Sequence, residues 1–153
     1  MIFTIPTNPA QLNDAVQLFN EYANSLDISL DFQNFQEELN IIQTMYGSPT
    51  GCLLLVYENE LPIACAAYRK IEEGICELKR MYIKPEFRRM QIGQTLLIKL
   101  SNKATMNGYQ LMRLDTLDTM LPALHLYRKN GFYEIPAYCH NPNEGVVYME
   151  KKL

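Results

Sequence analysis

Hydrophobic positions in the first third of the chain recur every three or four residues, the spacing of one helix face. The first run begins after Asn8-Pro9, an N-cap followed by proline in the first turn, and continues to about Leu26. Its apolar positions are Leu12, Ala15, Val16, Phe19, Tyr22 and Ala23. A second run extends from Phe35 to Met45 and ends at Gly47-Ser48-Pro49. We therefore predict two helices, preceded by a short strand.

From Cys52 onward the pattern changes to short apolar runs separated by polar turns, which is typical of strands. Cys52 to Tyr57 and Leu61 to Tyr68 predict a hairpin. Ile75 to Ile83 predicts a third strand, which ends at Pro85. The three strands together predict an antiparallel meander.

Helical spacing returns at about Gln91 and ends at Asn107-Gly108. A strand from Leu111 to Thr116 and a helix from Pro122 to Asn130-Gly131 follow. Two closing strands are predicted at Phe132 to Ala137 and Val146 to Lys152. Because strands and helices alternate in the second half, we expect an α+β fold with α/β-type layers, a mixed sheet covered by helices.

The length of 153 residues, 48% of them hydrophobic, suits one domain, 1–153, with one core. The longest obvious apolar run, Cys52 to Tyr57, is too short to span a membrane, and Met1 to Pro6 lacks the features of a secretory signal. We therefore expect a cytoplasmic protein. The four cysteines are widely spaced, and His125 and His140 do not cluster with them, so we expect free thiols and no metal site.

The net charge of -3 argues against nucleic acid as a partner. Basic residues are nevertheless concentrated between Lys79 and Arg89, where Glu86 is the one acidic residue. Those basic residues are Lys79, Arg80, Lys84, Arg88 and Arg89. This segment offers a landing place for an acidic molecule.

The same segment is a strand that enters a basic turn and opens into a helix. The first amides of a helix point outward and the helix dipole adds positive potential, so such a turn can hold a phosphate group. Gly93 lacks a side chain, which allows its backbone to approach a ligand closely. The alternative, a charged turn that is merely solvated, stays open on these grounds alone.

The turn resembles the signature of the GNAT N-acetyltransferases: Arg or Gln, two residues, Gly, one residue, then Gly or Ala, after an aromatic-aliphatic pair and Pro-Glu. Arg88 and Gly93 match the first and last positions, and Tyr82 to Phe87 matches the lead-in. Gln91 replaces the middle glycine, and Arg89 stands where glycine is also frequent. Gln91 would still supply a backbone amide, provided that its φ is negative.

A second segment, Ala123 to Phe132, resembles the family pattern Ala-x-x-x-Tyr-x-x-x-Gly-Phe, with Tyr127 on the tyrosine. Met120 stands where the family commonly has an asparagine. The strand Arg113 to Leu117 and the tail from Ile135 to Glu150 resemble a bacterial branch whose substrates are mostly unassigned. The resemblance covers roughly residues 50 to 153.

The resemblance implies a mixed, mostly antiparallel sheet of six to seven strands, flanked by about four helices and splayed where acetyl-coenzyme A enters as cosubstrate. Amides from Arg88 to Gly93 would hold its pyrophosphate, and the main chain of Met81 and Ile83 would pair with the pantetheine arm. The implied cofactor-binding residues are Met81, Tyr82, Ile83, Arg88, Arg89, Met90, Gln91, Ile92, Gly93, Gln94, Met120 and Ala123.

Acetyl transfer to an amine needs a neutral amine, a polarised carbonyl and a proton for the leaving thiolate. Glu77 lies four residues before Met81, hence on the same strand face, and the family's general base occupies that position. Tyr127 is the expected acid, and a backbone N–H between Met81 and Ile83 would meet the oxyanion. The alternative for Glu77 is an exposed glutamate that pairs with Lys79, and the alternative for Tyr127 is a tyrosine of the core.

Phe32, Phe35 and Tyr46 fall in the region that forms the substrate side in the family, and they are either acceptor-pocket or core residues. The expected activity is direct transfer to a primary amine of a small molecule or peptide in a ternary complex, with no membrane or nucleic-acid partner. The alternative is a catalytically lapsed module that binds coenzyme A or a protein. The sequence leaves the acceptor open, and also the oligomeric state, although a homodimer is common in the family.

Overall fold

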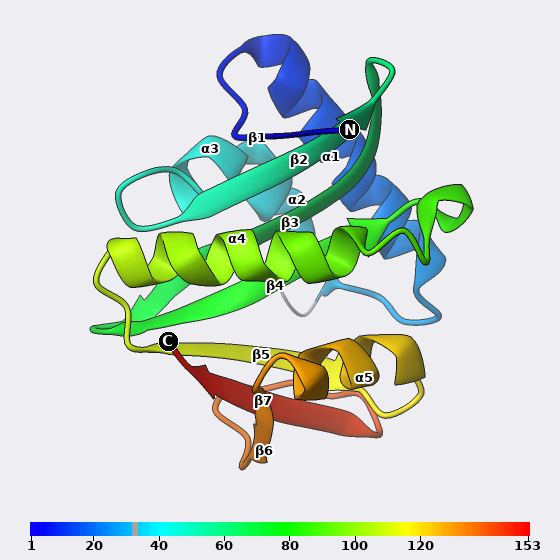
Figure 1. The fold of residues 1–153 in the computed structure, drawn as a ribbon. Coiled ribbons are helices and arrows are strands. Elements are labelled where there is room, and N and C mark those ends of the chain that lie inside the picture. The colour runs from blue at the N-terminus through cyan, green and yellow to red at the C-terminus, as the bar shows by residue number, and fades with distance from the viewer. Residues whose placement is uncertain (32–33) are drawn as a thin grey trace.

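The computed structural model describes residues 1–31 and 34–153. Its strands form one seven-stranded sheet in the order β1-β2-β3-β4-β5-β7-β6 (Figure 1). Their bounds are β1 Ile2–Thr4, β2 Cys52–Glu58, β3 Leu61–Glu72, β4 Ile75–Ile83, β5 Leu111–Leu117, β6 Tyr133–Ile135 and β7 Val146–Lys152. Among the described strands only β4 and β5 pair in parallel, so the expected mixed and mostly antiparallel sheet is confirmed.

Helices cover both faces of this sheet. They are α1 Pro9–Ser25, α2 Phe35–Asn40, α3 Ile42–Met45, α4 Ile92–Met106 and α5 Leu121–Lys129, with a 3-10 turn at Pro85–Phe87. α1 begins as predicted, with the Gln11 amide donating to Asn8 Oδ1 at 3.0 Å. α4 lies across one face and α1 across the other (Figure 1). Two buried clusters of apolar side chains, one under α4 and one under α1, hold these layers together.

The helix predicted from Phe35 to Met45 is two helices, so the structure has one α-helix more than expected within the described residues. The break is at Ile41, whose φ of -119° and ψ of 24° lie outside helical values. Its side chain is 37% exposed, and Ile42 directly after it is buried. Two consecutive β-branched residues crowd a helical turn, and spacing alone does not reveal that weakness.

A β-bulge in β4 changes the direction of its side chains. Lys79 pairs with Ala67 and Tyr82 with Cys65, so β4 has one residue more than β3 between these pairs. Arg80 lies at this point with a φ of 58°. Lys79 therefore faces α1 and α2, whereas Met81 packs against the cluster under α4.

The sheet opens between its two parallel strands. β4 and β5 are in register only where Ile75 to Glu77 face Leu111 to Arg113. Beyond these pairs the strands separate, and the edge of β4 from Leu78 onward has no partner strand in the described chain. The expected splay is therefore present, and it leaves backbone groups of β4 available to a ligand.

Candidate active site

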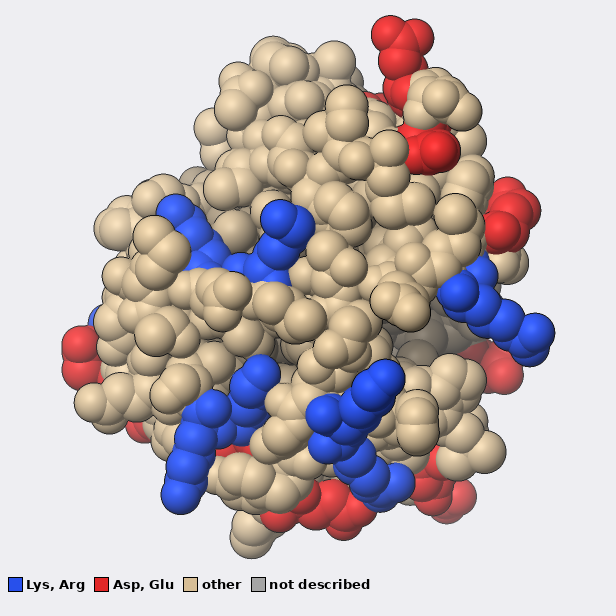
Figure 2. Space-filling view, in the orientation of Figure 1, with Lys and Arg blue, Asp and Glu red and all other residues tan. Residues whose placement is uncertain are grey.

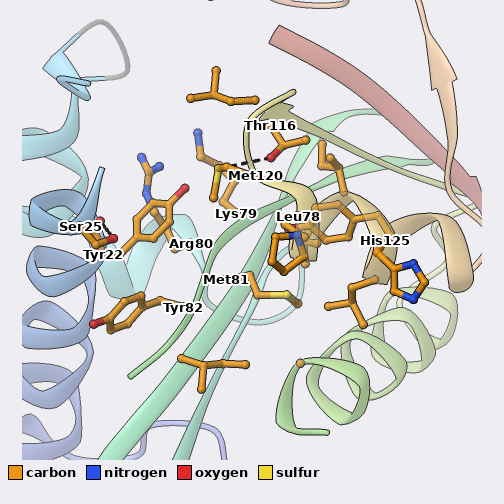
Figure 3. A pocket seen from close by; sticks show the side chains of 18 of the residues that line it. Tyr22, Ser25, Leu78, Lys79, Arg80, Met81, Tyr82, Thr116, Met120 and His125 are labelled. Atoms are coloured by element: carbon orange, nitrogen blue, oxygen red, sulfur yellow. Dashed lines mark hydrogen bonds between the residues drawn. The ribbon is translucent and has the colours of Figure 1, made fainter. Parts of the chain in front are cut away.

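A cavity of about 760 Å³ lies where β4 and β5 separate. Side chains from both faces of the sheet line it. On the α4 side the wall includes Met81, Leu126 and Tyr127, and on the α1 side it includes Tyr22 and Tyr82. Figure 3 shows this division, with Tyr22 and Arg80 on one side and Met81 and His125 on the other. One cavity thus connects the two faces of the sheet through the gap between the strands.

The basic turn forms one end of this cavity. Arg89 and Gln91 both have left-handed backbone, with φ of 68° and 59°, so the negative φ assumed for Gln91 is wrong. The two positions at which glycine is frequent thus keep a glycine-type conformation with side chains present. The backbone amides from Arg89 to Gln94 find no acceptor in the part of the chain that the structure describes. These donors are available to an anion at the start of α4.

Gly93 lies at a close contact between α4 and its neighbours. A Cβ at this position would lie 3.1 Å from Leu126 Cδ2 and 3.4 Å from Ile83 Cδ1. The absent side chain therefore lets α4 approach both α5 and β4. Access for a ligand is an additional consequence of the same close approach.

The five cations between Lys79 and Arg89 do not form one patch, contrary to their clustering in the sequence. Lys79 and Arg80 turn toward acidic residues on the α1 side, and Lys84 lies 3.6 Å from Glu21. Arg88 and Arg89 line the cavity from the basic turn, whereas Lys79 and Arg80 line it from β4. Figure 2 shows Lys and Arg side chains on both sides of a hollow near the start of α4.

The predicted cofactor-binding residues line the cavity with one exception, Met90, whose side chain is 51% exposed and lies outside it. Met120 is on the wall, and its sulfur accepts a 3.6 Å hydrogen bond from Thr116 Oγ1. The Gln94 amide exchanges hydrogen bonds of 2.8 and 2.7 Å with Asn130 on α5. Gln94 thus joins the two helices beside the cavity.

Tyr127 combines features of both sequence interpretations. Its ring packs in the core with its centroid 5.7 Å from that of Phe132, and the residue is 8% exposed. It also lines the cavity, and its hydroxyl has no hydrogen-bond partner in the described chain. Burial, with smaller contributions from Tyr22 and Asp115, raises the pKa of the Tyr127 hydroxyl. The phenol therefore keeps its proton at neutral pH.

Glu77 lies on the opposite face of β4 from Met81, so the expectation of a shared face is wrong. The bulge at Arg80 inserts one residue and reverses the alternation between the two positions. Glu77 is 4% exposed, which contradicts the exposed-glutamate alternative. The pairing that this alternative proposed is present, because Lys79 Nζ lies 3.7 Å from Glu77 Oε1.

A second cavity, polar and about 240 Å³ in volume, contains Glu77. Arg69 Nε donates to Glu77 Oε1 at 3.1 Å, and the Tyr138 hydroxyl donates to Oε2 at 2.8 Å. Burial and the Glu77 charge raise the pKa of the Tyr138 hydroxyl, so it remains a donor. This cavity shares Lys79 and Asp115 with the main one, so Glu77 adjoins the main cavity without lining it.

The residues predicted for an acceptor pocket do not reach the main cavity. Phe35 and Tyr46 are 6% and 2% exposed and belong to the core under α1. The Phe35 ring supports Arg80, whose guanidinium carbon lies 5.2 Å from the ring centroid. Phe32 lies outside the described residues.

Much of the α1-side wall comes from residues to which sequence reasoning assigned no role in a site. It includes Leu26, Ile28 and Leu30 after the end of α1, and Asp115 on β5. No motif marks these positions. They meet at the cavity because α1 packs across the sheet, and only the spacing of α1 with the turn after it could have suggested this.

The cysteines Cys52, Cys65 and Cys76 are buried free thiols, as predicted, whereas Cys139 is exposed. Among the described residues no group of three or more His, Cys, Asp or Glu side chains could hold a metal ion. None of the described helices has the length and apolar character to cross a membrane.

Comparison with known proteins shows the family of the chain. The model of the acetyltransferase (GNAT) family matches residues 13–132. A protein of Schizosaccharomyces pombe described as an uncharacterised N-acetyltransferase is 37% identical over 147 residues, covering 95% of this chain and 90% of the relative. A Dictyostelium discoideum protein of the same description is 29% identical, covering 89% of this chain and 92% of the relative.

A solved structure of the PaiA N-acetyltransferase from Thermoplasma acidophilum, in complex with coenzyme A, has the same fold. It superposes with a TM-score of 0.73 at 20% sequence identity, over 100% of both chains. The chain belongs to the GNAT family and is an acyltransferase. The expected bacterial branch is not supported, because the two relatives described above come from a yeast and an amoeba.

Proposed function

We propose that the protein transfers the acetyl group of acetyl-coenzyme A to a primary amine by direct attack in a ternary complex. The observation that carries this proposal is the cavity that passes through the sheet between β4 and β5. A thioester entering from the α4 side and an amine entering from the α1 side would meet in that gap. Proximity of this kind lowers the barrier because both reactants are held in place.

The α4 side of the cavity has the groups needed to bind acetyl-coenzyme A. Free amides from Arg89 to Gln94, with Arg88 and Arg89 beside them, would bind a diphosphate. The unpaired edge of β4 would accept the pantetheine arm as an added strand. Arg88 Nε donates to the Ile83 carbonyl at 3.1 Å, so Arg88 would release that oxygen if the arm pairs there. A backbone N–H between Met81 and Ile83 would stabilise negative charge on the carbonyl oxygen.

Proton transfers would be divided between the two faces. On the α4 side the Tyr127 hydroxyl would donate its proton to the departing thiolate as the C–S bond breaks and the C–N bond forms. On the α1 side Glu77 would receive the amine proton through water in the small polar cavity that it lines. Arg69, Tyr138 and Lys79 hold the Glu77 carboxylate in that cavity.

A lapsed coenzyme A-binding module is the second candidate. Two features favour it. The side chains of Arg89 and Gln91 occupy positions where glycine is frequent in the family, and the Ile83 carbonyl already accepts a hydrogen bond from Arg88. The open hydroxyl of Tyr127 favours the enzyme.

The experiment combines calorimetry with a thiol-release assay on the full chain. We expect acetyl-coenzyme A to bind and free thiol to appear with at least one amine in a panel that includes 2-phenylethylamine, ethylamine, glycine, spermidine and a short peptide. Binding without thiol release across the panel would favour the module. No binding at millimolar acetyl-coenzyme A would refute both.

A further inference from the structure

The α1 side of the main cavity contains the carboxylate of Asp115, which no described residue neutralises. Two neutral groups contact its Oδ2: Asn141 Nδ2 donates at 3.0 Å, and the Cys139 thiol lies at 3.9 Å. Oδ1 accepts no hydrogen bond from any residue that the structure describes. Asp115 lines both cavities, so its side chain borders space that a ligand could occupy.

The other charges on this side are already matched. The ion pairs among described residues on this side include Arg80 with Glu38, Arg69 and Lys79 with Glu77, Lys84 with Glu21, and Arg113 with Glu150. Asp115 forms no ion pair with a described residue. A half-buried carboxylate in a partly apolar cavity loses hydration, and a cationic ligand would restore the lost interaction.

The wall around Asp115 is mostly apolar on the side of α1. Leu26, Ile28 and Leu30 line it with the ring of Tyr22. Ser25 on α1 also lines this cavity, and its hydroxyl already donates to the Tyr22 carbonyl oxygen at 2.6 Å. This wall would bury an alkyl or aryl group and offers little to a second charge.

We propose that Asp115 binds the ammonium group of the acceptor, and that the acceptor is a primary amine with a compact apolar body. The ammonium would donate to Asp115 Oδ1 while Asn141 holds Oδ2, and the apolar body would lie against Leu26, Ile28 and Leu30. Asp115 is then a specificity-determining residue, and the ion pair places the nitrogen at the gap between β4 and β5. The inference rests on the proposed transfer to an amine.

The test compares amines in the wild type and in Asp115→Asn. We expect wild-type kcat/KM to be higher for 2-phenylethylamine than for ethylamine, glycine or spermidine. Asp115→Asn should raise KM for 2-phenylethylamine by about 10- to 100-fold, with a smaller change in kcat, because one charge-assisted hydrogen bond is lost. Asp115→Glu retains the charge and should recover most of the affinity.

The matched control is Asp118→Asn, the same change on an exposed aspartate of the following turn, outside both cavities. It should leave KM unchanged, and both variants should keep the wild-type Kd for acetyl-coenzyme A. Calorimetry on the wild type, independent of any variant, should show at least about tenfold tighter binding of 2-phenylethylamine than of neutral 2-phenylethanol.

An unchanged KM in Asp115→Asn, equal binding of the amine and the alcohol, or a preference for glycine or spermidine would overturn this inference and leave the proposed function intact. Failure of the proposed function is separate, because it would show as absent acetyl-coenzyme A binding or absent transfer to every amine.

Discussion

Tyr127 has a ring fixed by core packing and a hydroxyl that faces the cavity without a partner in the described chain. Tyr127→Phe keeps the ring and removes only the proton donor. We expect kcat to fall about 10²-fold while the Kd for acetyl-coenzyme A and the Tm change little. Steady-state thiol release over a wide pH range, with calorimetry and thermal unfolding, would measure these quantities.

Tyr109→Phe is the matched control for that variant. Its hydroxyl donates to the Thr50 carbonyl at 2.6 Å, away from both cavities, so its removal should affect stability but not kcat. Full activity of Tyr127→Phe at every pH would exclude Tyr127 as the acid.

Gln91 holds a left-handed conformation that costs an L-residue about 1–2 kcal/mol. Glycine avoids this cost but loses about 0.5–1 kcal/mol of chain entropy on folding. Gln91→Gly should therefore raise the free energy of unfolding by about 0.5–1 kcal/mol. Urea unfolding would measure it, and the Kd for acetyl-coenzyme A should not rise.

Met90→Gly serves as the comparison, because Met90 is exposed and is not among the residues with positive φ. There glycine should lower the free energy of unfolding by about 0.5–1 kcal/mol. If both variants were destabilised alike, the strain assigned to Gln91 would be absent.

Site residues in continuous motifs could be predicted from the sequence. The turn from Arg88 to Gly93 and the position of Tyr127 follow from local pattern, and the structure brings them, except Met90, to one cavity. The face of Glu77 could not be predicted, since alternation fails across a bulge that no spacing announces. Asp115 escaped notice because its role depends on which cations are engaged elsewhere, and that is a property of the packed structure.

At the scale of elements, β4 is joined to α2 by a buried ion pair. Arg80, at the bulge, donates from Nε and Nη2 to the two Glu38 oxygens at 2.7 and 2.8 Å. The side chains are 3% and 2% exposed, and the rings of Tyr22 and Phe35 lie against the guanidinium. The bulge in β4 thus directs Arg80 toward Glu38, and this ion pair connects α2 to the sheet.

Removing one partner of this pair leaves a buried charge unmatched. Glu38→Gln should lower the free energy of unfolding by about 3–5 kcal/mol. The double variant Glu38→Met/Arg80→Met should lose less than the sum of its single variants, because no charge remains unpaired. Urea unfolding of the wild type, Glu38→Met, Arg80→Met and the double variant completes the double-mutant cycle.

The exposed pair of Arg128 and Glu134 gives the contrast, with side chains 56% and 62% exposed. Glu134→Gln should change the free energy of unfolding by less than about 1 kcal/mol. Additive losses in the Glu38 and Arg80 cycle would show that the two side chains do not act as a pair.

Element boundaries were predicted well where the apolar period is uninterrupted. β4 and β7 have the predicted bounds, and α4 begins one residue after Gln91. The helix expected from Phe35 to Met45 failed at Ile41, where backbone crowding competes with a favourable apolar pattern.

For the whole molecule, the sheet order places the N-terminal four strands and the C-terminal three on opposite sides of one seam, between β4 and β5. The alternation of strands and helices predicted a mixed sheet, but not where it opens. The opening depends on how far two strands stay in register, and side-chain pattern does not encode that length. The opening between β4 and β5 determines where the cavity lies, and it makes the cavity accessible from both faces of the sheet.

Three residue pairs are all that hold β4 and β5 in register. Amide hydrogens beside this seam should therefore exchange with solvent sooner than those between β2 and β3, where the register extends over seven pairs. A ligand that contacts both strands would stabilise the seam between them. Amide exchange at the seam should therefore slow as the fraction of protein with bound ligand rises.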